Sequence, residues 1–142
     1  MVKVSRISPL QLSAIAFSLL LLGGMATSHA AEVKLSGGEE VPAVQSSAAG
    51  QGDISVGSDK KVSGSVSTSG VEGTAAHIHM GARGKSGPVV VPLMKGSDNN
   101  WTVPAGATLT DPQYKAYQAG DLYVNVHSAA HKDGEIRGQL KP

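Results

Sequence analysis

Residues 76–80, with the sequence AHIHM, decide the fold of this chain. Apolar residues alternate here with histidine, and successive side chains of a β-strand point to opposite faces. The alternation therefore predicts a strand that buries Ile78 and turns both imidazoles to the other face. Residues 122–127, LYVNVH, show the same period of two, with His127 among the polar positions. The sequence thus predicts two strands that carry histidine on the face away from the core.

Short alternating segments of this kind fill most of the chain after residue 30. Further strands are expected at residues 33–36, 53–56, 62–66, 89–91 and 136–140. The residues Gly57-Ser58-Asp59-Lys60 read as a hairpin turn between two of them. The apolar run Val89-Val90-Val91 favours a more buried strand. The pattern predicts an all-β domain, an antiparallel, Greek-key-like sandwich or barrel.

One segment has the signals of a helix instead. Thr110 is the expected N-cap, Pro112 lies in the first turn, and Gln113 is placed to complete a capping box. Gly120 is the expected stop. We expect one short helix of about two turns that crosses over between strands.

The first thirty residues are excluded from the fold. A short basic segment is followed by an apolar run over residues 10–22, and residues 28–30 offer the small side chains that a signal peptidase recognises. The run is shorter than the roughly 20 residues that span a bilayer. We therefore expect a signal peptide at 1–30, a domain at 31–142, no membrane span after cleavage, and a periplasmic or secreted protein.

Composition excludes several classes of function. The chain has 12 Lys and Arg, 11 Asp and Glu, and no Cys. Lys3 and Arg6 fall in the predicted signal peptide, which moves the formal charge from +1 to −1 on cleavage. No basic patch is visible, so no nucleic-acid partner is expected. Without Cys, thiol catalysis and disulfides are excluded, and a metal site must use histidine and carboxylates.

The histidines are the most informative polar residues. Four of them follow the predicted signal peptide: His77, His79, His127 and His131. If the two histidine-bearing strands are neighbours, the first three imidazoles converge, and His131, in a loop, is a candidate fourth ligand. Such a set suits one copper or zinc ion. Two alternatives stay open: polar side chains on a solvated face, and a metal-free structural or adhesion module that contacts an extracellular or periplasmic protein or matrix.

Other polar motifs are assigned to loops and surfaces. Residues 81–86 end like a phosphate-binding loop, but the first Gly of that motif is missing and Pro88 forbids the helix that should follow. Residues 39–40, both Glu, are expected in a solvated loop. Arg137 beside Glu135 is expected to form a surface ion pair worth under about 1 kcal/mol. No catalytic residue is assigned, and no enzyme activity is expected.

Several short stretches, in order along nearly the whole chain after residue 30, follow one known pattern. They are residues 35–37 (LSG), 40–42 (EVP), 76–79 (AHIH) with the glycines of 81–87, 109–111 (LTD), 122–127 (LYVNVH) and 134–140 (GEIRGQL). Together they resemble the CHRD domain family, named from chordin. The resemblance implies a β-sandwich module of extracellular and bacterial exported proteins, usually without a defined enzymatic role.

Residues 77–79 also resemble the H-V-H strand of copper/zinc superoxide dismutases. Those enzymes need four copper-binding histidines, one of which bridges to zinc, an Asp zinc ligand and usually a disulfide. This chain has too few histidines for two metals and no Cys. A dismutase-like redox enzyme is therefore a third hypothesis, and a mononuclear site is the more economical inference.

Overall fold

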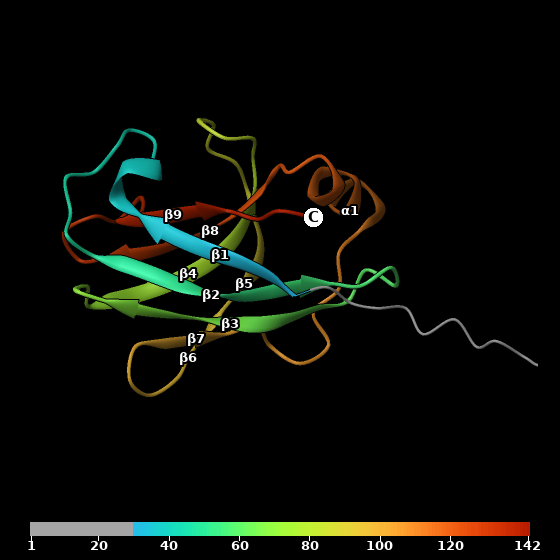
Figure 1. The fold of residues 1–142 in the computed structure, drawn as a ribbon, viewed down its shortest axis with the longest axis horizontal. Coiled ribbons are helices and arrows are strands. Elements are labelled where there is room, and N and C mark those ends of the chain that lie inside the picture. The colour runs from blue at the N-terminus through green and yellow to red at the C-terminus, as the bar shows by residue number, and fades with distance from the viewer. Residues whose placement is uncertain (1–29) are drawn as a thin grey trace, which may run out of the picture.

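The computed structural model describes residues 30–142, which form one antiparallel β-sheet curled into a nearly closed barrel, with one α-helix (Figure 1). The strands are β1 (Ala31–Ser36), β2 (Ala49–Val56), β3 (Val62–Ser69), β4 (Gly73–Met80), β5 (Val89–Pro92), β6 (Met94–Lys95), β7 (Asn100–Thr102), β8 (Leu122–Ser128) and β9 (Ile136–Gln139). A 3-10 turn, η1 (Gly37–Glu39), follows β1, and α1 (Asp111–Gln118) precedes β8. The predicted signal peptide lies outside the described residues except for Ala30.

The order of the strands confirms the predicted all-β architecture. They are hydrogen-bonded in the order β5-β4-β8-β9-β1-β2-β3-β7-β6. The first and last strands of the domain are therefore neighbours, with Ser36 paired to Arg137 (Figure 1). The predicted hairpin is formed by β2 and β3, with Val56 opposite Val62. Strand β4 pairs with β8, which follows it in the chain only after three further strands and the helix.

The two ends of the sheet are brought together by one segment of chain. Strand β5 pairs with β4, and β6, which begins two residues after β5 ends, pairs with β7. Leu93, between them, donates its amide hydrogen to the Ala76 carbonyl of β4 at 2.9 Å. Residues 89–95 thus contain both end strands of the sheet, β5 and β6. This arrangement leaves little unpaired strand edge, which otherwise invites association with other chains.

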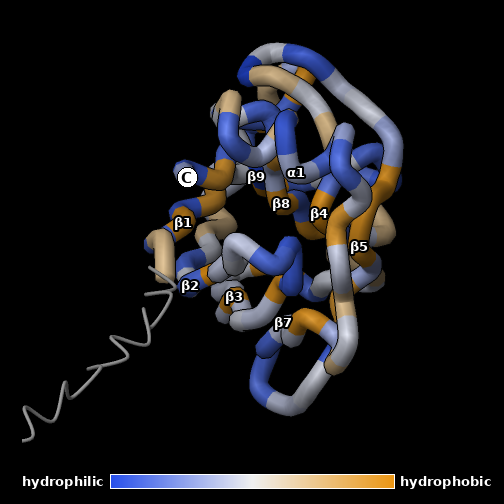
Figure 2. Tube along the Cα trace, turned by 90° about the vertical axis from the view of Figure 1, so that its right-hand side faces the viewer, coloured by the Kyte–Doolittle hydropathy of each residue, from blue (hydrophilic) through white to orange (hydrophobic). Residues whose placement is uncertain are grey.

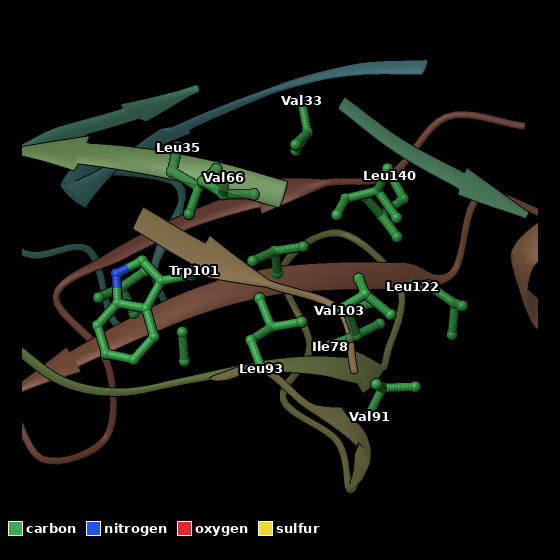
Figure 3. Packing of buried hydrophobic residues seen from close by; sticks show 14 of the residues in the cluster. Val33, Leu35, Val66, Ile78, Val91, Leu93, Trp101, Val103, Leu122 and Leu140 are labelled. Carbon is green, nitrogen blue, oxygen red and sulfur yellow. The ribbon is translucent and has the colours of Figure 1, made fainter. Parts of the chain in front are cut away.

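The interior of the barrel is filled by the apolar phase of each strand. In Figure 2 the hydrophobic positions of β4, β5 and β8 lie close together, and Figure 3 shows their side chains meeting those of the other strands. Val66, Val124 and Val126 are fully buried, and Ile78 is 1% exposed. Burying one such side chain contributes about 1.5–3 kcal/mol. The predicted inward phase of these strands is confirmed.

The prediction of a more buried strand at 89–91 was wrong for one of its residues. Val91 is 4% exposed, but Val89 is 49% exposed. The reason is that β5 ends the sheet order and has a single paired neighbour, β4. A run of β-branched residues also fits a strand that is buried on one face only.

The helix agrees with its sequence signals. Gln113 donates its backbone amide hydrogen to the Thr110 hydroxyl at 3.4 Å, and its side-chain oxygen accepts from the Thr110 amide at 2.8 Å. Pro112 lies in the first turn, and Gly120, with φ 80°, follows the last turn. Tyr117 packs into the core. No helix within residues 30–142 has the length and apolar character needed to cross a membrane.

Replacement of the helix cap tests this description. Thr110→Ala removes the hydroxyl acceptor of the capping box and is expected to lower the free energy of unfolding by about 1 kcal/mol. Thr108→Ala, which removes an exposed hydroxyl outside the helix, is the matched control and should cost less. Urea unfolding followed by circular dichroism measures both. Equal stability of Thr110→Ala and the wild type would contradict the capping box.

Candidate metal centre

The pairing of β4 with β8 places three histidines on the outer face of the barrel. His79 lies opposite Tyr123, His77 opposite Asn125, and His127 opposite Ala75. The intervening residues point into the core, as the burial of Ile78 shows. Since alternate residues of a strand share a face, the three imidazoles come from neighbouring positions on two adjacent strands. The two histidine-bearing strands are thus neighbours, which is the condition for the three imidazoles to converge.

The three rings converge on one point. Nδ1 of His77 lies 3.1 Å from Nε2 of His127. The ring centroids of His77 and His79 are 5.5 Å apart, and those of His79 and His127 are 6.1 Å apart. One ring nitrogen from each residue lies within 4.8 Å of the other two. The structure thus brings together His77, His79 and His127, as predicted.

Main-chain carbonyls set the tautomers of two of these rings. Nδ1 of His79 donates to the Gly87 carbonyl at 2.9 Å, and Nδ1 of His127 donates to the Lys132 carbonyl at 2.7 Å. A carbonyl oxygen only accepts hydrogen bonds, so in the neutral rings Nδ1 carries the proton and Nε2 keeps its lone pair. Histidine ligands of metals commonly donate their other ring nitrogen to such an acceptor. Both rings are therefore oriented as Nε2 ligands.

The surroundings of His77 and His79 favour the neutral form of these two rings. Burial lowers the pKa of His77 below 6.5, and the neighbouring His127 and His79 lower it further. Burial also lowers the pKa of His79, against the opposing effect of its hydrogen bond to Gly87. Because His127 Nε2 has no proton in the neutral state, His77 Nδ1 donates to it across the 3.1 Å contact. Neutral imidazole is also the form that binds metal.

The spacing suits a single ion after small ring rotations. Nitrogens that share a tetrahedral zinc ion at about 2.0–2.1 Å lie about 3.4 Å from one another. The 3.1 Å contact between His77 and His127 is close to that separation, and the third nitrogen is at most 4.8 Å away. Rotation of the rings about their side-chain bonds would have to close the rest of the gap. The three residues could hold one metal ion.

Gly87 holds the carbonyl that orients His79. A Cβ added at Gly87 would lie 1.7 Å from the Met80 carbonyl oxygen, so only glycine allows these two segments of backbone to approach so closely. The Gly87 amide donates to the Tyr123 hydroxyl at 3.2 Å. A register shift between Ile78 and His79, in the pairing of β4 with β5, lies beside it. Such irregularities often re-aim a side chain next to a functional site.

His131 is not brought into this group. The group of described residues whose ligand atoms lie within 4.8 Å of one another contains only the other three histidines. His131 closes a tight turn in which its amide and carbonyl pair with those of Ser128, both at 3.2 Å. It lines a small surface pocket with Glu40 and Pro42. Its predicted role as a fourth ligand gains no support from this position.

A stack of side chains beside His79 was not predicted from the sequence. The Tyr123 ring lies parallel to His79, with 4.9 Å between ring centroids and an interplanar angle of 4°. The Arg137 guanidinium carbon lies 3.4 Å from the Tyr123 ring centroid and reaches it from β9, the strand on the other side of β8. Arg137 is 2% exposed and donates to the Ala82 carbonyl at 3.0 Å. The Tyr123 ring is thereby fixed under His79.

Two polar assignments made from the sequence were wrong. Arg137 forms no surface ion pair, because its guanidinium is buried against Tyr123, while Glu135 accepts a hydrogen bond from Ser46 at 2.8 Å. Glu40 does not lie in a solvated loop, because it is 8% exposed. Burial raises the Glu40 pKa above 4.5, and the charge of Arg137 opposes that rise. One indication of polar contacts on this face was present in the sequence: Tyr123 and Asn125 alternate along the strand in step with His127, and so share its face.

Comparison with known proteins identifies one family. Residues 31–140 match the family model of the CHRD domain. The chain matches no curated protein and no solved structure. The match covers the whole barrel, including the three convergent histidines, and agrees with the resemblance carried by the short motifs.

The metal-free protein is expected to lose stability as the pH falls below about 6.5. His77 and His79 titrate near 6.5 when unfolded and lower when folded, so the unfolded state binds more protons. Their contribution is complete above the unfolded pKa and falls as the pH drops toward the folded pKa. Urea unfolding with a chelator present, at about pH 7.5 and about pH 5.5, measures the difference.

A variant separates this effect from that of Glu40, whose raised pKa acts in the opposite direction. His77→Gln should lose less stability than the wild type over the same pH interval. His131→Gln, outside the cluster, controls for the removal of one titratable ring. A His77→Gln protein with the full wild-type pH dependence would show that the cluster is not responsible.

Proposed function

This chain belongs to the CHRD domain family, and we propose that it is an exported β-fold binding module that holds one copper or zinc ion at His77, His79 and His127. The observation that carries the proposal is the convergence of three imidazoles, two of which have Nδ1 bonded to a main-chain carbonyl. The role would be metal sequestration, transfer or stabilisation of the fold. The predicted signal peptide supports export. The proposal assigns no catalytic residue.

The burial of His79 favours a metal over the solvated-face alternative. His79 is 8% exposed, and its Nε2 is buried with no hydrogen-bond partner among residues 30–142. A buried polar atom left without a partner costs about 1–3 kcal/mol. Coordination of an ion by Nε2 removes that cost. A purely structural module would gain nothing from this arrangement.

The donor set favours copper and zinc over other common ions. Neutral imidazole nitrogens suit these two metals, whereas magnesium and calcium prefer oxygen ligands. Three protein ligands leave a fourth position free, as in zinc sites that bind water or another small ligand. The three nitrogens come from two paired strands, so the site is held by the sheet.

Metal loading tests the proposal. The purified protein, incubated with Zn(II) or Cu(II) and then desalted, is expected to retain one equivalent of metal and to melt at a higher temperature. With free metal at 100 times the dissociation constant, the stabilisation is about 2.7 kcal/mol. Retention should weaken below about pH 6.5, because protons compete for the imidazoles. Elemental analysis and thermal melts give both readouts.

Single histidine replacements locate the site. His77→Ala and His127→Ala should each abolish retention and stabilisation, whereas His131→Ala should keep both. A protein that retains no metal after desalting is instead a metal-free structural or adhesion module. If His131→Ala lost metal as completely as His77→Ala, the three-histidine assignment would be wrong.

A further inference from the structure

A pocket of about 400 Å³ lies beside the histidine cluster. Its walls include two of the proposed ligands, His79 and His127, and the side chains of Glu40 and Asn125. Three protein ligands leave one coordination position open. An ion held by His79 and His127 would therefore border this pocket.

The pocket contains buried acceptors without donors. Glu40 Oε1 and Asn125 Oδ1 are buried and, like His79 Nε2, have no hydrogen-bond partner among residues 30–142. Glu40 is 8% exposed and Asn125 is 2% exposed. Two oxygens of this kind accept hydrogen bonds, and each costs about 1–3 kcal/mol while it stays unpaired. The pocket is thus suited to a small ligand that donates hydrogen bonds.

A glycine allows these two acceptor residues to lie close to the backbone and to each other. A Cβ at Gly134 would lie 2.4 Å from Glu40 Oε1 and 2.5 Å from Asn125 Nδ2, so only glycine lets the carboxylate and the amide approach. Gly134 also has φ +127°, which other residues rarely adopt. Asn125 Nδ2 donates to the Asp133 carbonyl at 3.3 Å. Nδ2 makes this bond, whereas Oδ1 is the amide atom without a partner among residues 30–142.

Asn125 connects this pair to the metal ligands. In the sheet it lies between His77 of β4 and Arg137 of β9. Its side chain therefore lies on the same face as the three imidazoles, two residues from His127 along β8. Glu40 reaches that face from the turn after η1. The acceptors are thus part of the wall that an ion at the histidines would face.

We propose that the pocket holds an exchangeable water molecule on the fourth position of the ion, with Glu40 and Asn125 accepting its two hydrogens. This inference rests on the proposed function. It makes the centre open to small exogenous ligands instead of a closed structural site. It also gives Glu40 a role in selection, because its carboxylate attracts a hydrogen-bond donor and repels an anion that competes for the same position.

Azide binding to the copper-loaded protein tests this inference. Azide is a small anion that replaces water on Cu(II), and its binding is followed by the azide-to-copper charge-transfer absorption and by electron paramagnetic resonance. The wild type should show a saturable change with one site. Glu40→Gln removes the negative charge while Arg137 keeps its positive charge nearby, so azide should bind roughly fivefold more tightly.

Two further variants make the result specific. Glu39→Gln removes the neighbouring carboxylate, which pairs with Arg83 at the surface, and should leave azide affinity within about twofold of the wild type. Glu40→Asp keeps the charge and should stay closer to the wild type than Glu40→Gln. The wild-type titration needs no variant, so it tests the open position even if a replacement of Glu40 fails to fold.

The outcomes separate the two proposals. A protein that binds no copper overturns the proposed function and this inference with it. Copper bound stoichiometrically, with spectra that azide does not change, overturns only the open position. Equal effects of Glu39→Gln and Glu40→Gln overturn the role of Glu40, because they would reflect net charge alone.

Discussion

The register between β4 and β8 is the constraint on which the site depends. It sets His77 and His79 beside Asn125 and Tyr123 and brings His127 to the same face. A slip of one residue would turn the histidines into the core and the valines outward, at a large cost in buried apolar surface. The apolar phase of the two strands, with Ile78 and Val124 at most 1% exposed, therefore fixes the positions of the imidazoles. The pairing that packs the core therefore also sets the geometry of the site.

Hydrogen bonds from loop carbonyls then set the orientation of two of the imidazoles. Strand pairing brings the rings together, but the carbonyls of Gly87 and Lys132 decide which nitrogen of His79 and His127 is free. Both carbonyls belong to loops, and each loop is held against the sheet by glycine positions that allow close approach. The outer face of the barrel thus carries its own buried polar layer, in which Tyr123 is stacked between His79 and a buried arginine.

The parts of the structure that were predicted are those that local sequence determines. The alternation around Ile78 and the capping box at Thr110 each involve residues a few positions apart, and both were confirmed. The exposure of Val89 depends on its strand lying at the end of the sheet. The burial of Glu40 and Arg137 depends on contacts with residues far away in the chain, such as Asn125 and Tyr123. No local pattern encodes such contacts.

The case of His131 shows the same limit within the site. Its spacing from His127 suggested a fourth ligand, yet the backbone pairing of His131 with Ser128 closes a turn that directs the chain elsewhere. Conversely, Asn125 lies in the same polar phase as His127, and phase alone gave no reason to choose it. Sequence reasoning found the ligand candidates through chemistry and alternation. The residues that orient and surround them became visible only with the fold.

The most direct test of the central claim is the nitrogen NMR spectrum of the histidine rings, recorded by long-range proton–nitrogen correlation before and after one equivalent of Zn(II). The hydrogen bonds of His79 and His127 to main-chain carbonyls predict Nδ1-protonated tautomers for both rings in the metal-free protein at neutral or higher pH. Zinc should then shift Nε2 of these two rings and Nδ1 of His77 to the positions of coordinated nitrogen, while His131 is unaffected. Nε2-protonated rings at residues 79 and 127, unchanged by zinc, would contradict it.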